Sequence, residues 1–138
     1  MPVEQVFAHK WPSGSGVWLI GIAVRMDILA ESLSISTEEW EEEGLGPARG
    51  AWLKLSNSRI VLVYELAHAI KFHGARGPAV EVDAQEAATL GLDHLTAEVK
   101  SALSLTEDQI IVINRDAEAW RDDAAQAVKL RSQQRPLE

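Results

Sequence analysis

The run Glu38-Glu39-Trp40-Glu41-Glu42-Glu43 places five carboxylates around one tryptophan. Such a surface attracts cations, and tryptophan is a common anchor in protein interfaces. Because neighbouring carboxylates repel one another, we expect this run on the surface, either as one or two helical turns with Ser36 as N-cap or as an irregular acidic loop. The alternative is that Trp40 folds back onto the core while the acids face solvent.

Two arginines lie in segments of similar composition, Gly46-Pro47-Ala48-Arg49-Gly50 and Gly74-Ala75-Arg76-Gly77-Pro78. We expect both segments to be loops. If they lie at the same end of a sheet, Arg49, Arg76 and the glycine-rich backbone would form an anion site, to which His68 or His73 could contribute. The alternative is that each arginine bonds a nearby carbonyl or carboxylate, while the Gly and Pro residues serve the turns.

Motifs for metal, nucleotide or nucleophile chemistry do not occur: there is no cysteine, no HExxH, no P-loop and no GxSxG elbow. The segment Gly44–Gly50 superficially resembles a dinucleotide loop, but it follows a carboxylate run and precedes an apolar run, where that motif needs a strand and then a helix. His68 and His73 have a spacing that suits neither one face of a helix nor one face of a strand. We therefore expect neither a metal nor a cofactor, and the sequence favours a binding protein over an enzyme.

Length and composition predict a single domain over residues 1–138, with a frayed tail over 133–138. Apolar residues make up 46% of the chain, and no apolar run reaches the ~18 residues that a membrane span needs. The net charge of −8 repels nucleic acid and anionic membranes and would attract a basic protein. The lack of cysteine fits a reducing compartment, so we expect a cytoplasmic protein.

The apolar pattern predicts an α+β fold, with a mostly antiparallel sheet built on a central hairpin and covered by C-terminal helices. The hairpin joins Ala51–Leu55 to Ile60–Leu66, and the second strand is apolar on both faces, as in the centre of a sheet. Further strands are expected at Val3–Trp11, Val17–Val24, Ala79–Val82 and Ile110–Ile113. Two segments stay open between strand and helix, Val17–Val24 and Glu65–His73.

Capping residues and apolar spacing predict the helices. Asp27 would cap a short helix over Ile28–Leu33, and Asp83 would cap a helix over Ala84–Leu90. A further helix would restart at Asp93, and a last one would follow Asp116. We expect three tryptophans to lie in the core: Trp18, Trp52 and Trp120.

In charge, size and lack of cysteine the chain resembles the small acidic bacterial proteins that neutralise a basic toxin or nuclease, although no motif carries this resemblance. The first hypothesis is therefore a binding protein of immunity, antitoxin or inhibitor type. It would present Glu38, Glu39, Trp40, Glu41, Glu42 and Glu43 to a basic protein partner. The alternatives are a small-anion or enzymatic site that uses Arg49, Arg76, His68 and His73, and a homodimer joined by exposed tryptophans.

Overall fold

The computed structural model describes residues 3–6, 11–42, 46–56, 58–67 and 76–114. Several expectations lie wholly or partly outside these residues: those on Glu43, on His68, on His73, on the loop from Gly74, on the predicted helix after Asp116 that carries Trp120, and on the frayed tail over 133–138.

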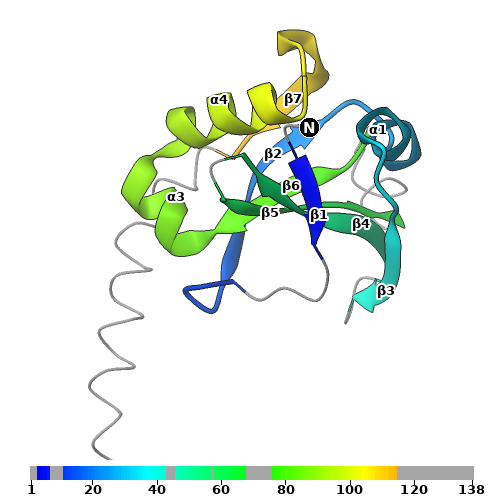
Figure 1. Cartoon of the computed structure of the whole chain (residues 1–138), viewed down its shortest axis with the longest axis horizontal. Coiled ribbons are helices and arrows are strands. Elements are labelled where there is room, and N and C mark those ends of the chain that lie inside the picture. Colours follow the sequence, from blue (N-terminus) through cyan, green and yellow to red (C-terminus); the bar gives the residue numbers. More distant parts are fainter. Residues whose placement is uncertain (1–2, 7–10, 43–45, 57, 68–75, 115–138) are drawn as a thin grey trace, which may run out of the picture.

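The described elements form a single antiparallel sheet with helices packed on it (Figure 1), which confirms the predicted α+β fold. The strand order is β1-β4-β5-β6-β2-β7, and β3 also pairs with β4. No described helix is long and apolar enough to cross a membrane. The strands are β1 (Val3–Val6), β2 (Gly16–Ile22), β3 (Glu38–Glu42), β4 (Gly46–Leu55), β5 (Ile60–Leu66), β6 (Ala79–Asp83) and β7 (Ile110–Ile113). The helices are α1 (Met26–Leu33), α3 (Ala84–Leu90), α4 (Leu92–Ala102) and the short 3-10 helix η1 (Glu107–Gln109).

The predicted hairpin is confirmed as β4 and β5, and β5 is central, between β4 and β6. In register, Leu53 lies opposite Val61, which in turn lies opposite Val82. These side chains point to one face of the sheet, where they join one buried cluster with side chains of α1, α3 and α4. Each fully buried Val or Leu contributes roughly 1.5–3 kcal/mol, so this face supplies most of the core.

Two strands, β3 and β1, pair with the same edge of β4. Residues Gly46–Gly50 pair with β3, and Trp52–Leu55 pair with β1. The other edge of β4 pairs with β5. Strand β3 pairs with no other described strand, so it lies at the margin of the sheet (Figure 1).

The acidic run is a strand, and so is the first arginine-bearing segment, which corrects two expectations. Residues Glu38–Glu42 form β3 rather than helical turns or an irregular loop, and Gly46–Gly50 form the start of β4 rather than a loop. A strand sends successive side chains to opposite faces, which separates neighbouring carboxylates better than a helical turn does. Gly50 is required for close strand approach, because a Cβ there would lie 2.1 Å from the Val63 carbonyl oxygen.

Helix α1 begins at Met26 with Arg25 as its N-cap residue, so the expected cap by Asp27 is wrong. Its first-turn N–H at Met26 instead donates to the carboxylate of Glu65, at 3.1 Å. The Glu65 carboxylate on β5 thus takes the place of a local N-cap, because the N-terminus of a helix favours negative charge.

Other boundaries follow the sequence more closely. The cap at Asp83 is confirmed, since its side chain accepts from the backbone N–H groups of Gln85 and Glu86. Helix α4 begins at Leu92 after Gly91, one residue before the expected Asp93.

Trp18 is 39% exposed, so its expected place in the core is wrong.

Candidate functional site

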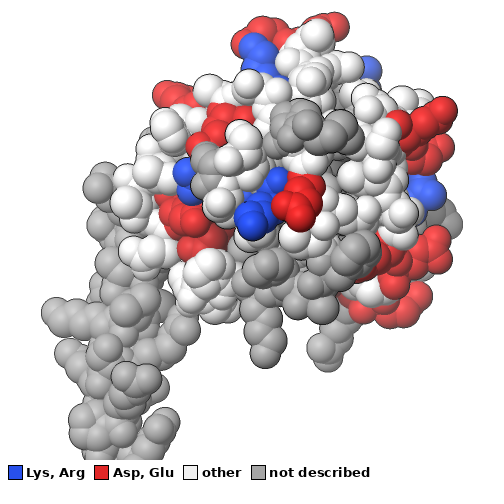
Figure 2. Space-filling model, viewed as in Figure 1, with Lys and Arg blue, Asp and Glu red and all other residues white. Residues whose placement is uncertain are grey.

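Strand β3 carries a concentration of carboxylates that have no cationic partner among the described residues. Glu39, Glu41 and Glu42 are exposed and Glu38 is half-buried. The half-buried Trp40 donates from Nε1 to Glu42 Oε2 at 2.8 Å. Figure 2 shows carboxylates gathered where Figure 1 places β3. The strand thus presents an exposed acidic surface built around one indole.

The alternation of the strand divides this surface between the two faces of the sheet. Glu39 lies opposite Arg49 in register and shares its face, which is the face of the core. Trp40 lies opposite Ala48 and points to the other face. A cavity lies on each side of β3, and both cavities are lined in part by Glu39 and Trp40.

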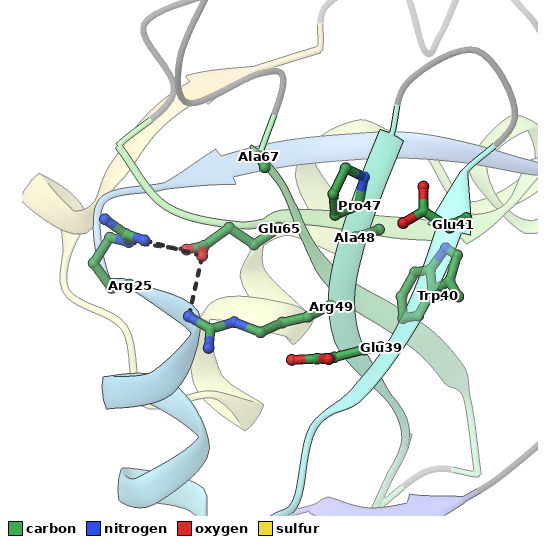
Figure 3. A pocket seen from close by; sticks show the side chains of 9 residues that line it. All are labelled: Arg25, Glu39, Trp40, Glu41, Pro47, Ala48, Arg49, Glu65 and Ala67. Atoms are coloured by element: carbon green, nitrogen blue, oxygen red, sulfur yellow. Dashed lines mark hydrogen bonds and ion pairs between the residues drawn. The ribbon is translucent and has the colours of Figure 1, made fainter.

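The first cavity, of about 620 Å³, is named the Glu65 pocket. Glu65 is only 6% exposed and receives two guanidiniums, as Figure 3 shows. Arg25 donates from Nε at 3.1 Å and from Nη2 at 3.3 Å, and Arg49 donates from Nη2 at 3.4 Å. The bond to this carboxylate raises the pKa of Arg25 further above its ordinary value. The pocket is lined by Arg25, Glu39, Trp40, Glu41, Pro47, Ala48, Arg49, Glu65 and Ala67.

The predicted pair of arginines is not assembled around this pocket. The strand register puts Arg49 and the segment of Arg76 at the same end of the sheet, since Glu65 pairs with Arg49 and the neighbouring Tyr64 pairs with Ala79. Arg76, however, is exposed and does not line the pocket. His68 and His73 lie outside the described residues.

The lining of the Glu65 pocket carries a small negative formal charge. The described lining holds two arginines against the three glutamates Glu39, Glu41 and Glu65, a formal charge of −1. Both guanidiniums are already committed to Glu65. Arg25 was not among the expected site residues, and its only sequence signal is its position just before a helix. The link between Arg49 and Glu65 follows once the hairpin register is known.

The second cavity, of about 470 Å³, opens on the opposite face and is named the aromatic cleft. The rings of Trp11 and Trp52 lie with centroids 4.8 Å apart and a 55° interplanar angle. No described helix contributes to its lining. The lining residues are Trp11, Glu38, Glu39, Trp40, Glu42, Trp52, Leu62, Tyr64, Leu66 and Glu81.

Three parts of the fold build this cleft. Strands β4, β5 and β6 supply the floor, because Trp52, Leu62 and Glu81 lie side by side in register. Strand β3 supplies one wall through Trp40. The other wall is Trp11, which precedes β2 and was expected only as the end of an edge strand.

The position of Trp11 is set by a glycine and a buried carboxylate. A Cβ at Gly16 would lie 2.3 Å from Trp11 Nε1, so only glycine leaves room for the indole. The turn after Trp11 is tied to Asp83, which is 2% exposed and accepts from Ser13 N at 2.9 Å and from Ser13 Oγ at 2.8 Å. Asp83 thus caps α3 and holds the turn that carries Trp11.

The described lining of the aromatic cleft is negatively charged, and no basic residue of that lining compensates the charge. Burial, and then the nearby Glu42, raise the pKa of Glu81 above its ordinary value of 4.5. Burial, followed by Glu81 and Glu42, raises the pKa of Tyr64 to about 12. Each shift shows that a further negative charge is disfavoured there, and a bound cation would relieve both.

The described residues contain no group of three or more His, Asp or Glu side chains placed to hold a metal ion. No protein-family model matches the chain, and no curated protein or solved structure is significantly similar to it.

Proposed function

We propose that this chain is a non-enzymatic binding protein that engages a basic protein partner through β3. The observation that supports this most strongly is the set of four glutamates, Glu38, Glu39, Glu41 and Glu42, on a strand at the margin of the sheet. None of them forms an ion pair with a described basic residue.

Elsewhere in the described fold, four carboxylates are paired with the chain's own arginines and lysine. Arg25 and Arg49 meet Glu65, while Lys100 meets Glu107. Arg59 joins Glu86 on α3 to Glu98 on α4. Against this background, β3 is an acidic surface left open. Such a surface raises the association rate of a basic protein and excludes acidic ones.

The same charge supports a proposal for the type of partner. A protein whose basic surface serves its own activity, such as a nuclease or a toxin, would lose access to its substrate when β3 covers that surface. We therefore propose a protein of immunity, antitoxin or inhibitor type that acts in a bacterial cytoplasm. Glutamates on an edge strand disfavour pairing with a second copy of the same strand, so β3 is suited to a different protein rather than to a homodimer.

Photo-cross-linking tests this proposal, with the cross-linker at the exposed Ser36, just before β3. It is performed in the cells that produce the protein, on wild type and two charge reversals. Glu41→Lys changes β3, whereas Glu31→Lys changes an exposed position on α1. Each moves the formal net charge from −8 to −6.

We expect a protein of basic isoelectric point to be captured by wild type and by Glu31→Lys, and much less by Glu41→Lys. Equal capture by both variants, or an acidic captured protein, would contradict the proposal. The variants differ in the place of the changed charge and share its size, so a general loss of acidity cannot explain a difference between them.

A further inference from the structure

We propose that the aromatic cleft binds the guanidinium group of one arginine side chain of the partner. This inference rests on the proposed function, because the arginine belongs to the basic protein that β3 engages. It adds a defined subsite to what is otherwise a broad acidic surface.

The aromatic walls are suited to a flat cation. Trp11, Trp40, Trp52 and Tyr64 line one cavity, and the first and third of these rings are in tilted contact. A cation over the face of tryptophan is attracted by the ring, most strongly where water is excluded.

The charges select a cation over a neutral apolar group. The described lining includes Glu38, Glu39, Glu42 and Glu81, and no Lys or Arg. An apolar side chain would gain contact with the rings but would strip water from these carboxylates without compensation. A cation gains both from contact with the rings and from attraction to the carboxylates.

Glu65 and Glu81 differ in the hydrogen-bond donors that the fold supplies to their carboxylates. Glu65 is a buried carboxylate that accepts hydrogen bonds from two arginines of its own chain. Glu81 is half-buried on the opposite face, and no described residue donates to its carboxylate. The fold thus satisfies one carboxylate internally and leaves the other open to a ligand.

Guanidinium fits this site better than ammonium does. It is planar and weakly hydrated, it stacks on aromatic rings, and it forms paired hydrogen bonds with a carboxylate. Lysine carries a compact and strongly hydrated charge, which loses more on entering an aromatic cleft. The side chain would enter between Trp40 and Trp11 and direct its donors to Glu81.

The test uses the full chain labelled with ¹⁵N and a tripeptide probe, acetyl-Gly-Arg-Gly-amide. The indole N–H signals of Trp11, Trp40 and Trp52 should move together along one saturable curve, with a Kd of about 1 mM. The backbone amide signal of Ile28, which is exposed on α1 and outside the cleft lining, should stay in place. Two control probes replace arginine by citrulline, its neutral isostere, or by lysine.

Two isosteric variants complete the test. Glu81→Gln should weaken arginine-peptide binding about tenfold, while Glu31→Gln, which removes the same charge from α1, should leave it unchanged. Equal shifts with the citrulline peptide, or equal binding by both variants, would overturn the inference. Tighter binding of the lysine peptide would overturn the choice of guanidinium.

Failure of this inference is distinguishable from failure of the proposed function. If the arginine peptide does not bind but Glu41→Lys abolishes capture of the partner, β3 is the contact surface and the cleft is not a subsite. If the peptide binds as expected but Glu41→Lys captures the partner normally, the cleft binds guanidinium and β3 does not engage the partner.

Discussion

Replacing Glu65 by glutamine should destabilise the fold by about 2 kcal/mol. The wild-type carboxylate accepts four hydrogen bonds, three from Arg25 and Arg49 and one from the backbone N–H of Met26. The side chains of the two arginines are 51% and 34% exposed, so they can return to water and their ion pairs contribute little. Loss of charge-assisted hydrogen bonds at the buried Glu65 site costs ~1 kcal/mol. Loss of negative charge at the start of α1 contributes ~1 kcal/mol more.

Urea unfolding followed by far-ultraviolet circular dichroism measures this difference. For a chain of this size ~2 kcal/mol corresponds to a decrease in Tm of about 6 °C. Glu31→Gln on α1 is the matched control and should stay within ~0.5 kcal/mol of wild type, as exposed substitutions do. If Glu65→Gln is no less stable than this control, the carboxylate does not hold α1 and β4 together and the account of the Glu65 pocket is wrong.

Three further predictions concern the aromatic cleft. Since burial and Glu42 raise the pKa of Glu81, the folded state keeps this proton to higher pH than the unfolded chain, and stability falls as pH rises from 4.5 through the raised value. Glu81→Gln should therefore be more stable than wild type at pH 7 in urea titrations, with a difference that shrinks as the pH is lowered through that window; a constant difference would contradict it. Asp83→Asn should cost about 1–3 kcal/mol in the same assay and shift the indole signal of Trp11. The single carbonyl oxygen of asparagine cannot accept hydrogen bonds both from the backbone of α3 and from Ser13 in the turn after Trp11. An unmoved Trp11 signal would refute the anchoring role of Asp83. Gly16→Ala should displace Trp11 and abolish arginine-peptide binding while the circular dichroism spectrum is retained, since the added Cβ would lie 2.3 Å from the indole; unchanged binding would show that Trp11 is not a wall of the cleft.

The central hairpin was predictable because its signals are local. Ala51–Leu55 and Ile60–Leu66 are apolar runs on either side of a short polar turn, and the second run is apolar on both faces, as a central strand must be. The cap at Asp83 was predictable for a similar reason, since a capping side chain acts within three residues of itself.

The acidic strand was not predictable, because pairing decided its conformation. Glu38–Glu42 has a weak intrinsic preference for strand, and its Ser36 capping pattern indicates a helix. Pairing with Gly46–Gly50 prevails, since the backbone of β3 is hydrogen-bonded along its whole length to a strand that β5 already holds in place. Long-range pairing of this kind leaves no signature within the run itself.

The two cavities were beyond sequence reasoning for the same physical reason. Glu65 meets Arg25 across 40 positions in the chain, and Ser13 meets Asp83 across 70. Trp11 seemed to be part of an edge strand, and only the fold shows that it faces Trp52. Residue types indicated which groups could do chemistry, while strand order determined which of them meet.

Isothermal titration calorimetry with the purified basic protein that the cross-linking identifies tests the central claim most directly. Wild type, Glu41→Lys and Glu31→Lys would be titrated at low salt under identical conditions. If β3 is the contact surface, Glu41→Lys should bind about tenfold more weakly than wild type, a loss of ~1.4 kcal/mol, and Glu31→Lys should bind as wild type does. Equal dissociation constants for the two variants would contradict the claim that the carboxylates of β3 engage the partner.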